Sequence, residues 1–184
     1  MNEPLHFEDL QIGDNWTSRS RTITETDVVN FAGLSGDYDP LHMDHEYAQQ
    51  TPFGKPIAHG LLGLAWVAGL SSQAPAVNTL AFVALKDWRF LAPAYIGDTV
   101  HAVTEVSELH PNGRRSGRVI WRRKLINSRG DVLQAGMFET LVNLKHPLRR
   151  KDAPQKAARG PHAAIRERVK QPVASDRAVN DEKP

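Results

Sequence analysis

The stretch from Gly60 to Ser72 constrains the fold most strongly, because it is apolar on every side. It reads GLLGLAWVAGLSS, carries no charge, and contains a single β-branched residue, Val67. An all-round apolar helix must be buried, and the length of the run favours helix over strand. The run is shorter than the ~20 residues of a membrane span, so no membrane partner is expected. A chain of 184 residues is long enough to bury this helix in one domain.

After this helix the hydrophobic pattern changes to period two, which is typical of strands. The turn signals Asn112-Gly113 and Arg129-Gly130-Asp131 predict hairpins, so the last three strands should be antiparallel neighbours. One apolar helix followed by a long antiparallel meander predicts the α+β class. The sheet can bury the helix only by curling around it. The four expected strands are Leu80–Phe90, Asp98–His110, Arg115–Asn127 and Val132–Leu144.

The segment before the apolar helix predicts one strand and one short helix. Trp16 to Ile23 alternates and is rich in Thr, so we expect a strand there. Thr24 has Asp27 three residues later, which resembles a capping box. Gly36 is a natural stop for the helix that follows. One or two helical turns are also expected within residues 45–50.

A polar segment, residues 37–44, is expected to be a loop because Pro40 cannot continue a helix. It carries Asp37 and His42. An Asp and a His within reach of one water can act together as a general base and a general acid. Taken alone, such a pair is more often a turn former and a satisfied, half-buried histidine.

His59 and Gly60 open the apolar helix, where the backbone N–H groups lack helical partners and the helix dipole is positive. A glycine there lets a ligand approach the backbone. One such N–H can stabilise an oxyanion by roughly 3 kcal/mol, and Gly60 is the candidate donor. Gly60 could instead only relieve packing at a buried helix start. His59 could position the loop or the substrate without reacting.

The same polar residues could also be read as metal ligands. His42 and His45 would need a helix in order to converge, and Pro40 lies just before them. We therefore expect no metal and no other cofactor. The six candidate ligands are Asp37, Asp39, His42, Asp44, His45 and His59.

Charge and composition divide the chain near residue 148. The net charge of +2 arises from +5 in residues 149–184 and −3 in residues 1–148. The basic segment contains no Phe, Trp, Tyr, Leu or Met, so it cannot bury enough surface to fold. We expect a domain over residues 1–147 and a basic, disordered tail over 148–184. The folded part is not expected to bind nucleic acid.

Two further features bear on the compartment. The chain contains no cysteine, which removes disulfides and thiolate chemistry. Its acidic N-terminus lacks the apolar segment of a signal peptide. A soluble, cytoplasmic protein is expected.

Two motifs resemble the MaoC-like, (R)-specific enoyl-CoA hydratase family: residues 37–42 (DYDPLH) and residues 56–60 (PIAHG). A weaker echo follows in FLAP (90–93) and GDT (97–99), and the resemblance covers roughly residues 5 to 145. Asp39 departs from the family pattern, in which Asn is usual. Its carboxylate could weaken the base, or it could cap backbone N–H groups instead.

The resemblance implies a single hotdog fold and an acyl-CoA hydratase or dehydratase of fatty acid metabolism. It implies Asp37 as the base, His42 as the group that activates water, and the Gly60 N–H as the oxyanion donor. It also implies a homodimer or a dimer-based oligomer, and no metal or redox cofactor. The residues expected around the enoyl-CoA or hydroxyacyl-CoA substrate are His59, Pro40, Ala58 and Leu61.

Two other functions remain open at this point. A hotdog thioesterase usually carries an acid on its central helix, and residues 60–70 contain none. A non-catalytic acyl-CoA-binding or regulatory protein could use the basic tail as a docking arm. The basic residues that could hold the CoA phosphates are Lys86, Arg89, Arg114, Arg115, Arg118, Arg122 and Arg123, and the sequence does not choose among them.

Overall fold

The computed structural model describes residues 3–149. The chain begins with a 3₁₀ turn η1 (Phe7–Asp9) and two short strands, β1 (Asn15–Thr17) and β2 (Arg21–Thr22). Helices follow as α1 (Glu25–Ser35), α2 (Pro40–Met43), α3 (His45–Gln49) and α4 (Gly60–Ser71). Four long strands complete the described part: β3 (Thr79–Phe90), β4 (Thr99–Asn112), β5 (Ser116–Asn127) and β6 (Val132–Asn143).

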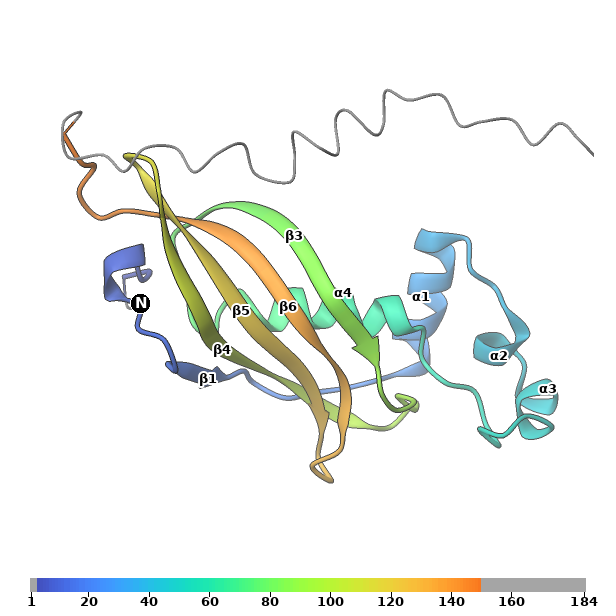
Figure 1. Cartoon of the computed structure of the whole chain (residues 1–184). Helices are drawn as coiled ribbons and strands as arrows, with labels where there is room; N and C mark the ends of the chain where they lie inside the picture. Colours follow the sequence, from blue (N-terminus) through green and yellow to red (C-terminus); the bar gives the residue numbers. More distant parts are fainter. Residues whose placement is uncertain (1–2, 150–184) are drawn as a thin grey trace, which may run out of the picture.

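The strands form one antiparallel sheet in the order β1-β4-β5-β6-β3, with β2 also pairing with β4. Figure 1 shows the long strands curving over α4, with α1, α2 and α3 gathered at one end of that helix. The hairpin neighbours β4-β5-β6 are those expected from the turn signals. The expected α+β hotdog architecture is therefore confirmed.

The core lies between α4 and the concave face of the sheet. Leu62 and Val67 of α4 are 7% and 0% exposed, and they pack in one cluster with Trp121, Leu125 and Phe138 of the sheet. Not every side of α4 is covered, however. Leu61 is 59% exposed, because the sheet of a single chain covers one side of the helix only. Full burial of α4 was therefore wrong for one chain by itself.

The start and the end of α1 follow the sequence signals. Thr24 and Asp27 form the expected capping box, and Gly36 ends the helix with a left-handed φ of 79°. The expected strand over residues 16–23 is instead broken into β1 and β2, and residues 18–20 between them are irregular.

The segment expected to be a loop contains the one-turn helix α2. Pro40 is its first residue, a position where the missing N–H of proline costs nothing. Asp39 is the N-cap, and its Oδ1 accepts a hydrogen bond of 2.8 Å from the Leu41 N–H. The loop prediction was wrong because proline starts a helix as readily as it stops one.

The predicted tail, residues 148–184, lies outside the described residues except for its first two. Of these, Leu148 donates its N–H to the Arg114 carbonyl at 2.9 Å. The domain boundary and the disorder of the tail stay predictions. No helix in residues 3–149 has the length and apolar character that crossing a membrane requires.

Candidate active site

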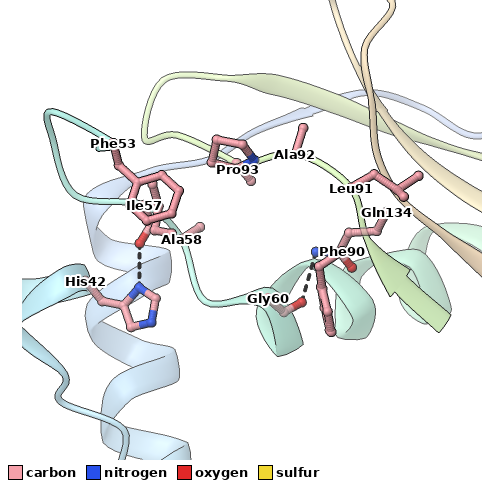
Figure 2. Close-up of a pocket in the computed structure, with 11 residues that line it drawn as sticks. His42, Phe53, Ile57, Ala58, Gly60, Phe90, Leu91, Ala92, Pro93 and Gln134 are labelled. Carbon is pink, nitrogen blue, oxygen red and sulfur yellow. Dashed lines mark hydrogen bonds between the residues drawn. The ribbon is translucent and has the colours of Figure 1, made fainter. Parts of the chain in front are cut away.

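A cavity of about 390 Å³ opens at the N-terminal end of α4. Figure 2 shows it between the loop that precedes α4 and the segment that follows β3. Its wall is mostly apolar, and two backbone-anchored polar side chains, His42 and Gln134, reach it. The lining residues are His42, Phe53, Ile57, Ala58, Gly60, Phe90, Leu91, Ala92, Pro93, Ala94 and Gln134.

His42 is held in one orientation by the backbone. Its Nδ1 lies 2.7 Å from the carbonyl oxygen of Ile57. A carbonyl can only accept, so Nδ1 carries the proton and donates it. In the neutral ring this leaves Nε2 with a free lone pair. Helix α2 therefore presents to the cavity an imidazole that can accept a proton from water.

His59 lies at the N-cap of α4 and is 2% exposed. Its Nε2 donates to the backbone carbonyl of Asp37 at 2.9 Å. Its ring centroid is 3.9 Å from that of His42 and 5.1 Å from that of Phe31. Nδ1 is buried and has no hydrogen-bond partner among the described residues. His59 thus joins the loop that bears Asp37 to the start of α4.

Asp37 itself is exposed. A carboxylate oxygen of Asp37 and one ring nitrogen each of His42 and His59 lie within 4.8 Å of one another. A water that hydrogen-bonds two groups about 2.8 Å away spans roughly 4.5 Å, which is compatible with this limit on the separation of the carboxylate and the His42 imidazole. Asp39 turns toward the Leu41 N–H instead, which is the capping role considered above.

Gly60 begins α4 beside the cavity. The N-cap residue, His59, makes no side-chain cap hydrogen bond, so the first-turn N–H groups are left without a cap. A Cβ on Gly60 would lie 2.8 Å from the ring of Phe90. On the other side, the Gly60 carbonyl accepts a 3.0 Å hydrogen bond from Gln134 Nε2, and Gln134 Oε1 accepts one of 3.3 Å from Trp88. These contacts fix the helix start against β6 and β3.

The structure brings most of the expected site residues together. His42, Ala58 and Gly60 line the cavity, and Asp37 and His59 lie beside His42. Pro40 and Leu61 are exposed and are not among the lining residues.

Several residues of the cavity wall were not predicted as site residues from the sequence. Phe90 was noted within a motif echo but was not predicted as a site residue, and it lines the cavity. Phe53 and Gln134 also line it. For these two residues the sequence offers no signal, since they reach the cavity only when the sheet curls over α4.

The triad of Asp37, His42 and His59 could also hold a metal ion. One carboxylate and two imidazoles are a ligand set that suits transition metals, and their candidate ligand atoms already converge. One nitrogen of each histidine is engaged with a backbone carbonyl, so only His42 Nε2 and His59 Nδ1 are free of such a bond, and His59 Nδ1 is buried.

Comparison with known proteins gives consistent relatives. Residues 9–128 match the family model described as "MaoC like domain". A 3-hydroxybutyryl-CoA dehydratase from Methylorubrum extorquens is 38% identical over 113 residues, which cover 61% of this chain and 70% of that one. An (R)-specific enoyl-CoA hydratase from Rhodospirillum rubrum is 39% identical over 107 residues, which cover 58% and 72%.

A solved structure extends the likeness to three dimensions. It is described as a monoamine oxidase regulatory protein from Archaeoglobus fulgius, is 39% identical, and has a TM-score of 0.72 over 76% of this chain and 95% of that one. The curated relatives carry hydro-lyase names, so the enzyme class expected from the sequence is confirmed. With the family model spanning well over half of its length, this chain belongs to the MaoC-like domain family.

Proposed function

We propose that the protein catalyses the reversible syn addition of water across the 2,3 double bond of an enoyl-CoA thioester. The observation that carries this proposal is that His42 and Gly60 line one cavity and that Asp37 lies beside His42. The Asp37 carboxylate and the His42 imidazole converge within 4.8 Å, and the Gly60 N–H opens α4 beside them. These groups supply a base, a proton carrier and an oxyanion donor.

In the hydration direction, a water lies between Asp37 and His42. Asp37 accepts a proton from the water, and His42 Nε2 orients it and shares the transfer. The water oxygen forms a bond to C3, and the electrons of the double bond move through C2 onto the thioester oxygen. The Gly60 N–H stabilises that enolate oxygen. The proton is then delivered to C2, and the enolate returns to the thioester.

Substrate binding draws on the apolar wall of the cavity. Two curated relatives are named for reactions of CoA thioesters. This supports CoA as the carrier of the acyl group of the substrate here. Ala58 lines the cavity, and we propose that it contacts the acyl thioester. His59 serves as a positioning residue through Asp37. Pro40 and Leu61 do not line the cavity of this chain. They would contact only a substrate that is bound to a partner subunit.

The proposal is tested by absorbance at the enoyl-thioester band with short, branched and long enoyl-CoAs. Asp37→Asn should lower the rate by roughly 100- to 10,000-fold while CoA-ester binding is retained. Asp39→Asn is the matched control, because Asn also caps a helix and this site lies two residues away. Absence of turnover with every thioester, or full activity in Asp37→Asn, would contradict the proposal.

A second candidate is a non-catalytic regulatory protein that binds acyl-CoA. The description of the A. fulgius structure as a regulatory protein favours it. Such a protein would bind CoA esters with no turnover to lose on substitution of Asp37.

A thiol assay in the same experiment separates hydration from thioester hydrolysis, because only hydrolysis releases free CoA.

We also propose that the working form is a homodimer. Leu61 of α4 and Leu80 and Phe82 of the edge strand β3 are 59%, 55% and 59% exposed. An edge strand with exposed apolar side chains is a natural place for a second copy. A cytoplasmic location stays a prediction.

A further inference from the structure

A second cavity, of about 280 Å³, lies along the C-terminal half of α4, away from the site described above. Arg123 of β5 is the one charged side chain among its lining residues. The rest of the wall is apolar or carries hydroxyl groups. The lining residues are Ala68, Ser71, Ser72, Pro75, Val77, Thr79, Phe82, Trp121, Arg123, Phe138 and Thr140.

Arg123 is a partly buried cation without a counterion in the described part of the chain. Its Nε is buried and makes no hydrogen bond, and within residues 3–149 it forms no ion pair. Burial lowers the pKa of Arg123 to about 10, so the group is still charged at neutral pH. Its guanidinium carbon lies 4.5 Å from the ring centroid of Phe138 and 5.8 Å from that of Trp121. Contact with these aromatic rings compensates only part of the free-energy cost of removing the guanidinium from water.

Two hydroxyl groups in the same wall have protons left to donate. Thr140 Oγ1 accepts a 2.8 Å hydrogen bond from Trp121 Nε1. Ser71 Oγ accepts one of 3.0 Å from Thr104 Oγ1. Each acceptor oxygen is therefore occupied while its own O–H is free. The cavity thus combines a positive charge and two O–H donors.

The further acceptors among the described lining residues are neutral, the hydroxyl oxygens of Ser72 and Thr79. No carboxylate of residues 3–149 lines the cavity, and the neighbouring Glu139 is engaged with Lys86 at 2.6 Å and Arg118 at 3.5 Å. The C-terminal end of α4 carries partial negative charge, yet Arg123 Nε has no hydrogen-bond partner among the described residues. A ligand that supplies acceptor oxygens would satisfy all three donors at once.

We propose that this second cavity binds a carboxylate with a short apolar body, held by Arg123 and by the hydroxyls of Ser71 and Thr140. The planar fork of a guanidinium matches the two oxygens of a carboxylate. The rings of Phe82 and Phe138 and the other apolar lining residues suit the hydrocarbon part of such a ligand.

Two sources share this chemistry: a free carboxylic acid, or a distal carboxylate on the acyl group of the substrate. The second source rests on the proposed function. Gly60 lines the first cavity and Ala68 the second, and eight residues of helix separate them by roughly 12 Å. An acyl group that reaches both cavities of one chain must extend over about that distance.

The direct test is titration with hexanoate, with hexan-1-ol as the uncharged probe, followed through the indole N–H signal of Trp121. Wild-type protein and Arg122→Met should bind hexanoate saturably and hexanol much more weakly. Arg122 is the matched control, since it is the neighbouring residue, is exposed and faces Glu105 at 3.4 Å. Arg123→Met should bind hexanoate at least roughly 30-fold more weakly.

Folding of the variant is checked at the same time. Arg123→Met replaces a partly buried charge that has no ion-pair partner within residues 3–149 by an apolar side chain of similar length. The melting temperature of this variant should therefore equal or exceed that of the wild type. Arg123→Lys keeps the charge without the fork and should bind hexanoate with intermediate strength. The Lys variant keeps the test decisive if the Met variant does not fold.

A kinetic arm separates the two sources. If the distal carboxylate of a substrate binds here, Arg123→Met lowers kcat/KM for an enoyl-CoA that ends in a carboxylate and leaves crotonyl-CoA unaffected. If the ligand is a free acid, both thioesters react as before and only hexanoate binding is lost. Absence of saturable hexanoate binding by wild-type protein, together with unchanged kinetics for both thioesters, overturns the proposal. Loss of self-association in Arg123→Met would then identify a carboxylate of a second copy as the occupant.

Discussion

At the scale of single residues, two backbone carbonyls decide which imidazole nitrogens are available. Ile57 accepts from His42 Nδ1 and Asp37 accepts from His59 Nε2. Each neutral ring is thereby fixed in one tautomer. The free nitrogen of His42 belongs to a ring that lines the cavity, whereas the free nitrogen of His59 is buried. We therefore propose His42 for proton transfer and His59 for holding the loop that bears Asp37 in place.

Two glycines of α4 should respond differently to the same substitution. A Cβ at Gly63 would lie 2.2 Å from Nε2 of the buried Gln134, whereas a Cβ at Gly60 would meet the ring of Phe90, which is 55% exposed and can move. Gly63→Ala should lower the free energy of unfolding by about 1–3 kcal/mol. Gly60→Ala should unfold close to wild type and lose about tenfold or more in kcat/KM.

Denaturant unfolding and initial rates on the same two samples check this pair. If Gly60→Ala retains full activity, a Cβ at position 60 does not obstruct the substrate, which contradicts a close approach of the substrate to the backbone there. Because alanine keeps the backbone N–H, this variant tests the approach and not the N–H itself.

Metal removal tests the other use of the triad. The proton-transfer scheme uses only the side chains of Asp37 and His42 and the Gly60 N–H, so dialysis against EDTA should leave the hydration rate unchanged. A rate that disappears with EDTA and returns with one divalent ion would assign Asp37, His42 and His59 as ligands. Metal analysis of the purified protein is the accompanying measurement.

At the scale of elements, the start of α1 depends on a charged capping box. Partial burial acts to raise the pKa of Asp27, but hydrogen bonds to Thr24 and the charge of Arg21 outweigh it and hold that pKa below its usual value of 3.8. A lowered pKa in the folded state means that Asp27 stabilises the fold above pH 3.8, and that this contribution is lost as the pH falls through the folded value.

Substitutions in this capping box should therefore change how the free energy of unfolding declines at acidic pH. Thr24→Ala should lower the free energy of unfolding at pH 7 by about 1 kcal/mol. Asp27→Asn should lower it at pH 7 and flatten its decline below about pH 5. Urea unfolding at several pH values between 3 and 7 measures both effects. Parallel curves for wild type and Asp27→Asn would contradict the assignment.

Signals contained within one element were reliable in the sequence. The apolar run at residues 60–72 became α4 (Gly60–Ser71), and the Thr24–Asp27 box became the start of α1. A sequence signal that is compatible with two different structures was not reliable. Pro40 was taken as a helix breaker and proved to be a first helical residue. Contacts made only when distant strands meet were also missed, and Gln134 against Gly60 is an example.

The site was predictable to a similar extent. Asp37, His42, His59 and Gly60 come from one continuous part of the chain, and they do meet. The wall supplied by Phe90 and Gln134 depends on how far the sheet curls, which no local pattern encodes. Arg123 was counted only as one basic residue among several, because partial burial without a counterion cannot be read from a sequence.

At the scale of the whole molecule, the curled sheet leaves two apolar surfaces uncovered. One is the side of α4 that bears Leu61, and the other is the edge strand β3 with Leu80, Phe82 and Leu85. β3 pairs with β6 on one side, and in the described residues no strand pairs with its other side. Free backbone groups and apolar side chains together favour pairing with another chain.

If a second copy pairs along this edge, charge placed there should separate the two chains. The double variant Leu80→Lys, Leu85→Lys should shift the mass measured by light scattering from twice that of one chain to that of one chain. Ile12→Lys is the matched control, since Ile12 is 67% exposed but lies outside β3. Because the first cavity borders Phe90 at the end of the same strand, the separated chains should also lose hydration activity. A wild-type protein that already scatters as one chain and is fully active would show that a single copy carries the complete site.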